Sequence, residues 1–120
     1  MIEPKRNTNI ADLDPNFKKK FDPWRAEVIK KYPKARIFET TRTLERQKWL
    51  FGIGRTHSFN KKPVTWKMNS MHLLGRAVDI VFVQDTGKIG RNGPYNDLIV
   101  MAKRYGIRNL RPAETCHFEG

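Results

Sequence analysis

The sequence predicts one small α+β domain of 120 residues, with a central, mostly antiparallel sheet flanked by helices. The run AVDIVFV over Ala77–Val83 is nearly continuous in apolar, β-branched residues, as expected of a strand buried on both faces. Residues 95–105 place apolar side chains on one face of a helix, and short extended pieces follow at 107–110 and 116–119. A chain of this length buries a core without disulfides, and Cys116 is its single cysteine.

The first 36 residues are expected to be the N-terminal helical part of this domain. Asp14-Pro15 and Asp22-Pro23 each place an N-cap residue before a proline suited to the first helical position. We therefore expect two short helices to begin at these two sites. The expected packing residues are Phe17, Phe21, Trp24 and Val28.

The middle of the chain alternates short elements with loops. An extended piece over 35–38 is followed by Thr41 to Thr43, which lead into a helix that runs to about residue 51 and ends at Gly52 and Gly54. The apolar residues of 55–71 show no sustained periodicity, which indicates a long loop of the kind that often forms the wall of a site. Residues 85–93 are predicted to form a polar turn. The helix at 95–105 should end at Gly106 and pack through Tyr95, Leu98, Ile99, Ala102 and Tyr105.

Positive charge dominates the composition, with 24 Lys and Arg against 12 Asp and Glu, and the excess is spread along the chain. A diffuse positive field attracts polyanions, including nucleic acid, anionic lipid headgroups and the anionic polymers of a bacterial envelope. A basic nucleic-acid-binding protein or a metal nuclease is therefore an alternative function, but the sequence holds no Cys-rich finger and no Gly-rich phosphate loop, so no specific nucleic-acid partner is expected. It also holds no apolar run of transmembrane length and no recognisable signal peptide. We expect a monomer.

One acidic residue stands in the predicted central strand. A buried Asp79 costs several kcal/mol in desolvation unless it is paired or binds a metal. His72 lies seven residues upstream, before a turn at Gly75, and His117 lies near the C-terminus. Two imidazoles and one carboxylate suit a catalytic zinc that keeps its fourth position for water. The same set also forms the facial triad of iron oxygenases, but the chain offers too few strands for the barrel of those enzymes.

Further residues are candidates for chemistry around such a metal. Glu114 lies three residues before His117, where a turn would hold its carboxylate beside the metal as a general base. Arg42 precedes a helix and is placed to aim its guanidinium at an oxyanion or a substrate carboxylate. Gln47 falls on the inward face of that helix, and Trp66 in the long loop is the expected aromatic contact to the substrate.

Simpler structural roles compete with several of these assignments. His57 lies in a polar loop and is expected to be a hydrogen-bonded structural histidine. Cys116 should point away from the face of His117 in an extended segment, which indicates a packed free thiol instead of a ligand. Arg42 also has an alternative as a helix cap, and Glu114 as a surface acid.

Two spaced motifs resemble the paired signature of the D-alanyl-D-alanine carboxypeptidase and L-alanyl-D-glutamate endopeptidase family of zinc peptidases. They are Ser70-x-His72-x-x-Gly75-x-Ala77-x-Asp79 and Glu114-x-x-His117. The family's preceding block is similar to Arg42-Thr43, Gln47, Leu50 and Gly54-Arg55-Thr56. The resemblance covers about residues 37–119. Two departures, Glu39-Thr40-Thr41 and Thr115-Cys116, leave the substrate preference open.

The resemblance implies a hedgehog/D-Ala-D-Ala peptidase-like fold and peptidoglycan as the substrate. It implies His72, Asp79 and His117 as ligands of Zn²⁺, Glu114 as the catalytic base and Arg42 as a transition-state or substrate contact, and it places Ser70 and Gln47 near the substrate. The compact chain looks most like a phage endolysin that cuts the L-Ala-D-Glu bond, made in the host cytoplasm and released to the wall through a holin. A D-Ala-D-Ala carboxypeptidase is the alternative within the family. The presence of Glu114 argues against a catalytically dead wall-binding module.

Overall fold

The computed structural model describes residues 3–63, 70–111 and 114–120. In chain order the elements are η1 (Ile10–Asp12), α1 (Pro15–Lys31), β1 (Ala35–Glu39), α2 (Leu44–Gly52), η2 (Met71–Leu74), β2 (Ala77–Val83), β3 (Ile89–Gly90), α3 (Tyr95–Lys103), β4 (Arg108–Leu110) and β5 (Glu114–Glu119). Every strand pairing among these residues is antiparallel, in the order β1-β2-β5-β4, and β3 pairs with β2. The predicted α+β class with a central antiparallel sheet is confirmed.

The first helix begins as its N-cap predicts. The carboxylate of Asp14 accepts hydrogen bonds from the backbone N–H groups of Asn16 and Phe17, each at 3.1 Å. These two donors have no partner within the helix, so the cap stabilises the start of α1. Pro15 follows at the first helical position, where its missing N–H removes no helical hydrogen bond.

The expectation of a second helix at Asp22-Pro23 is wrong, because α1 continues through Pro23 to Lys31. An interior proline removes one helical hydrogen bond and costs about 3 kcal/mol. Burial beyond Pro23 offsets this cost, since Trp24 and Val28 are almost fully buried and each contributes about 1.5–3 kcal/mol. The predicted stripe of Phe17, Phe21, Trp24 and Val28 is buried along the whole helix.

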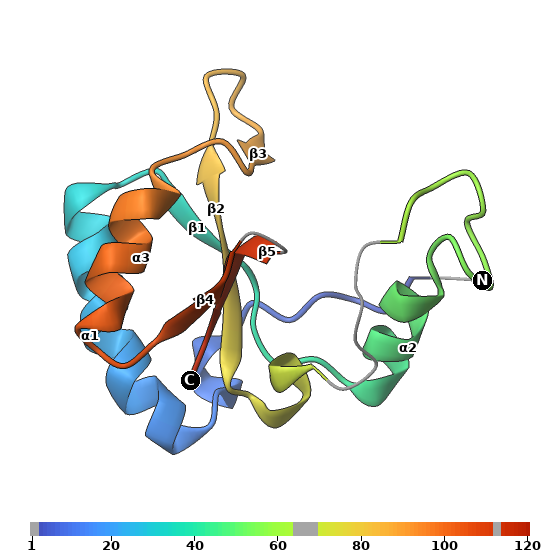
Figure 1. Ribbon diagram of the computed structural model, residues 1–120, viewed down its shortest axis with the longest axis horizontal. Helices are drawn as coiled ribbons and strands as arrows, with labels where there is room; N and C mark the ends of the chain where they lie inside the picture. Colours follow the sequence, from blue (N-terminus) through green and yellow to red (C-terminus); the bar gives the residue numbers. More distant parts are fainter. Residues whose placement is uncertain (1–2, 64–69, 112–113) are drawn as a thin grey trace.

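The apolar core lies between one face of the sheet and the pair of helices α1 and α3, which Figure 1 shows together on one side of the sheet. Val78, Ile80 and Phe82 alternate along β2 and belong to this core, as does Phe118 of β5. The ring of Phe118 lies 4.7 Å from that of Trp24. Because side chains alternate along a strand, Asp79 and His117 face the opposite side of the sheet.

Helix α3 also contributes side chains to this core. Its buried side chains are Tyr95, Leu98, Met101 and Ala102, while Ile99 and Tyr105 are partly buried against the same cluster. The helix ends at Lys103, two residues before the predicted end, and Gly106 follows in the turn at a φ of 71°, a conformation that favours glycine.

Helix α2 lies on the side of the sheet away from α1 and α3 (Figure 1). Its N-cap is Thr43, whose hydroxyl accepts from the backbone N–H of Arg46 at 3.2 Å. The helix ends at Gly52, and Gly54 has a φ of 75°. The region expected as a polar turn contains the short strand β3, whose residues pair with Phe82 and Val83. No helix in the described part of the chain is long and apolar enough to cross a membrane.

Candidate metal centre

Three side chains that are distant in sequence meet on the open side of the sheet. His72, Asp79 and His117 are each less than 7% exposed, and one potential ligand atom from each lies within 4.8 Å of the others. Oδ1 of Asp79 lies 3.2 Å from Nε2 of His72 and 3.3 Å from Nδ1 of His117. The structure therefore brings together the three residues predicted as metal ligands, in a group that could hold one metal ion.

Different elements bring the three residues to this point. Asp79 and His117 are cross-strand partners in the pairing of β2 with β5, so the sheet itself sets their separation. His72 lies in η2, whose N-cap is Ser70, with the hydroxyl accepting from the backbone N–H of His72 at 3.2 Å. Gly75 follows at a φ of 69° and turns the chain into β2.

Hydrogen bonds at the outer nitrogens determine how each imidazole is presented. Nδ1 of His72 donates to the carbonyl of Thr40 at 2.6 Å, and Nε2 of His117 donates to the carboxylate of Glu119 at 2.8 Å. These bonds leave Nε2 of His72 and Nδ1 of His117 facing Asp79, to which each donates when it carries a proton; without that proton, its lone pair is the one that would bind a metal. Acceptors at the outer nitrogens are the usual support of metal-binding histidines.

Sequence reasoning missed both supporting residues, Thr40 and Glu119. Glu119 had a signal, because it lies two residues after His117 in a predicted strand and such residues share a face. Thr40 had none, since it acts through its backbone carbonyl and any residue type provides that group.

The protonation of the group follows from its mutual contacts. Burial by itself would raise the pKa of Asp79, but hydrogen bonds from His117 and His72 outweigh it and hold that pKa well below its usual range. Burial opposes the charged form of His117, yet hydrogen bonding to Asp79 and the charge of Asp79 raise the pKa of His117 above its ordinary value. A carboxylate that stays ionised beside two imidazoles has the charge that a cation requires.

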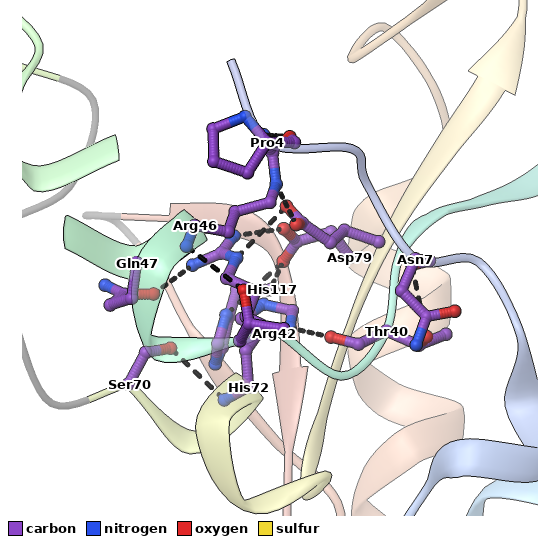
Figure 2. Close-up of polar contacts among 12 residues, drawn as sticks. Pro4, Asn7, Thr40, Arg42, Arg46, Gln47, Ser70, His72, Asp79 and His117 are labelled. Carbon is purple, nitrogen blue, oxygen red and sulfur yellow. Dashed lines mark hydrogen bonds and ion pairs between the residues drawn. The ribbon is translucent and has the colours of Figure 1, made fainter. Parts of the chain in front are cut away.

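Arg42 joins the group of His72, Asp79 and His117 to a buried ionic network, drawn in Figure 2. Its guanidinium donates to Gln47 at 2.9 Å and lies 3.4 Å from Oδ2 of Asp79 and 3.1 Å from Glu39. Glu39 also pairs with Arg46 at 2.5 Å, and Arg46 is 3% exposed. Gln47 is fully buried, in agreement with the inward orientation predicted for it.

A segment near the N-terminus, residues 3–7, also contacts this network. Arg46 pairs with Glu3 at 3.1 Å and donates to the carbonyl of Pro4 at 2.7 Å. The backbone N–H of Thr40 donates to the carbonyl of Asn7 at 2.7 Å (Figure 2). This segment therefore holds Thr40, whose own carbonyl accepts from His72.

Glu114 lies beside the group without belonging to it. Its Oε2 is 3.8 Å from Nδ1 of His117, and its side chain is 29% exposed. Asp79, His117, Glu114 and Arg42 all line one cavity of about 650 Å³. The partly exposed carboxylate thus has access both to the position between the candidate ligands and to a molecule in the cavity.

The remaining predicted residues are placed as follows. Ser70 caps η2, and its role as a substrate contact stays a prediction; Trp66 lies outside the described residues. His57 is structural, as expected, because its ring nitrogens bond to Ser58 and to the carbonyl of Trp49. Cys116 is a buried free thiol that packs with the apolar core, and burial raises its pKa to about 11.

Among solved structures, one comparison covers nearly the whole molecule. The chain shares the fold of ChiX. ChiX is an L-Ala D-Glu endopeptidase of Serratia marcescens; the TM-score is 0.61 at 20% identity, over 98% of this chain and 90% of ChiX. No family model matches the sequence, and no curated protein matches it.

The likeness to ChiX extends beyond the segment that carries the sequence motifs. Those motifs span about residues 37–119, whereas 98% of the chain is covered by the comparison with ChiX. Helix α1 therefore belongs to the shared fold, in keeping with its contribution to the core.

Proposed function

We propose that this protein is a zinc-dependent peptidoglycan peptidase that hydrolyses the L-Ala-D-Glu bond of the stem peptide. The observation that carries the proposal is the buried group of His72, Asp79 and His117, of which Asp79 and His117 line one cavity together with Glu114. The fold shared with ChiX, an endopeptidase for this bond, supports the choice of substrate. Fold alone does not define chemistry, so the side chains at the site carry the argument.

The donor set fits zinc. Two imidazole nitrogens and one carboxylate oxygen match the ligands of catalytic zinc sites, which use three protein ligands and keep one position open. Both imidazoles are oriented by acceptors at their outer nitrogens, as zinc-binding histidines usually are. When bound, zinc supplies Lewis-acid activation of water and of the peptide carbonyl.

The surrounding side chains perform the proton transfer and the charge stabilisation. Glu114 takes the proton of the attacking water and passes it to the leaving amine, which requires a carboxylate beside the metal position but free of it. Arg42 stabilises the negative charge that develops on the carbonyl oxygen, or binds a substrate carboxylate. Its contacts to Gln47 and Glu39 hold the guanidinium in one orientation.

The charge around the cavity suits an acidic peptide. Arg6, Lys61 and Arg91 line the same cavity and are exposed, and none of them forms an ion pair with another described residue. The stem peptide carries a free carboxylate on the carbon next to the scissile nitrogen, at L-Ala-D-Glu as at terminal D-Ala-D-Ala. Cationic side chains therefore favour this class of substrate over neutral peptides.

In this proposal the protein acts as a monomeric phage-type endolysin, made in the host cytoplasm and active on the wall after release. Its formal charge of +12 adds attraction to anionic envelope polymers. That attraction weakens as salt screens the charges, so binding to intact walls should fall at high ionic strength while cleavage of small soluble stem peptides changes less.

The test is digestion of purified peptidoglycan by the zinc-loaded protein, with the products identified by mass spectrometry. A new N-terminal D-Glu is the expected product, whereas release of free D-Ala would instead identify a D,D-carboxypeptidase. Glu114→Ala should retain one zinc and lose about 100- to 10,000-fold in kcat, the range usual for a general base. The control is Glu45→Ala, which removes an exposed acid in the first turn of α2. Normal cleavage by Glu114→Ala would remove Glu114 from the mechanism.

A further inference from the structure

The pairing of β4 with β5 is irregular next to His117, one of the three proposed metal ligands. Asn109 pairs with Phe118, but the next residue of β4, Leu110, pairs with Glu114. In an uninterrupted antiparallel ladder Leu110 would pair with His117. Residues 115–117 of β5 therefore have no partner on β4, and they form an arc that we call the β5 bulge.

The side chain of Asn109 replaces the hydrogen bonds that the ladder lacks at this bulge. Its Nδ2 donates to the carbonyl of Thr115 at 2.6 Å and to that of His117 at 3.1 Å. Its Oδ1 accepts from the backbone N–H of Arg111 at 2.8 Å. Two acceptors and one donor determine which end of the amide faces the bulge, and only an amide of this length supplies all three bonds.

The bulge decides where the carboxylate of Glu114 lies. In a regular strand, residues three apart point to opposite faces and are separated by about 10 Å. Glu114 and His117 are three apart, yet Oε2 of Glu114 is 3.8 Å from Nδ1 of His117. The irregular backbone therefore brings the proposed base onto the face that carries the ligand.

We propose that Asn109 is a positioning residue that keeps Glu114 beside the metal position by holding the β5 bulge closed. This inference rests on the proposed function and deepens it, since it concerns how the base is held. Asn109 bonds to backbone groups on both sides of Glu114, at Arg111 and at Thr115. Its hydrogen bonds within the described residues all go to backbone groups, including the carbonyl of His117 but not its ring, and so its loss should move the base and leave the metal bound.

The discriminating variant is Asn109→Asp, which keeps the size and the acceptor of the side chain but turns a second oxygen toward two carbonyls. We expect kcat to fall about 30-fold or more, with KM within about 3-fold and one zinc still bound. Asn16→Asp, the same change at an exposed residue of α1, is the control and should leave kcat unchanged. Asn109→Ser, which keeps a donor, should give a smaller loss and serves if Asn109→Asp does not fold.

A double-mutant cycle separates positioning from general damage. If Asn109 acts through Glu114, then adding Asn109→Asp to Glu114→Ala should lower the residual kcat by less than about 3-fold. An equal loss in both backgrounds, full activity of Asn109→Asp and Asn109→Ser, or loss of zinc from Asn109→Asp would each overturn the inference. An inactive wild-type protein would instead reject the proposed function, and the wild-type assay detects that outcome first.

Discussion

Glu119 accepts a hydrogen bond from Nε2 of His117 at 2.8 Å and is held on its other side by Arg108 at 2.9 Å. The side chains of Glu119 and His117 are both buried, so water weakens the hydrogen bond between them little. A carboxylate at the outer nitrogen fixes the tautomer of the ring and raises its basicity toward a metal. Glu119 therefore supports His117 in the proposed metal centre, although it contributes no ligand atom.

Glu119→Gln should weaken zinc binding by about 10- to 100-fold, because the amide loses the negative charge that favours the metal-binding tautomer. Competition against a chromophoric chelator measures the affinity directly. Glu45→Gln removes an equal charge at an exposed position and should leave the affinity unchanged. Unaltered zinc affinity in Glu119→Gln would mean that the bond to His117 has no supporting role.

Metal removal should destabilise the fold, because the three ligands come from separate elements and a bound ion links them. Zinc at 100 times its Kd adds about 2.7 kcal/mol to the free energy of unfolding, which is visible as a rise in Tm. His72→Ala should abolish this rise, while His57→Ala should keep it, since the ring of His57 bonds to Ser58 and to the carbonyl of Trp49, neither of which is a proposed ligand. Equal responses of the two variants would contradict the ligand assignment.

Arg46→Ala should cost about 3 kcal/mol of stability, because it leaves the buried carboxylate of Glu39 with Arg42 as its remaining cation. Urea unfolding measures the change in free energy. Lys48→Ala on the exposed face of the same helix should change it by less than about 0.5 kcal/mol. If Arg46→Ala also lost less than about 0.5 kcal/mol, Arg42 by itself would be sufficient to compensate the charge of Glu39.

Asp97 lies outside the proposed metal site, and its contacts predict how the stability of the fold depends on pH. A hydrogen bond from Lys31, then one from Tyr32, lowers the pKa of Asp97 below its usual value. A depressed pKa in the folded state adds stability above the unfolded value near 3.9, and this stability is lost as the pH falls through the lower folded value.

Asp97→Asn should therefore lower Tm at pH 7, by about 1–4 °C, and have a smaller effect near pH 2. Thermal melts at the two pH values measure the difference. The control is Asp85→Asn, at an exposed turn residue that makes no ion pair with a described residue. An equal loss of Tm at both pH values would exclude the ionic contribution.

The sequence determined the strand of Ala77–Val83, the N-cap at Asp14 and the buried stripe of α1, because period and capping chemistry are local properties. It also singled out His72, Asp79 and His117, since an acid in an apolar strand demands partners and few were available. These three residues are less than 7% exposed and lie together in the structure.

Only the tertiary structure decided that α1 continues through Pro23, since the local cost of the proline is offset by packing against Phe118 and the rest of the core. It also decided the support by Thr40 and Glu119 and the β5 bulge that places Glu114. These features depend on hydrogen bonds and register between segments far apart in the chain. Local sequence does not encode such contacts, because their energy arises only when the sheet brings the segments together.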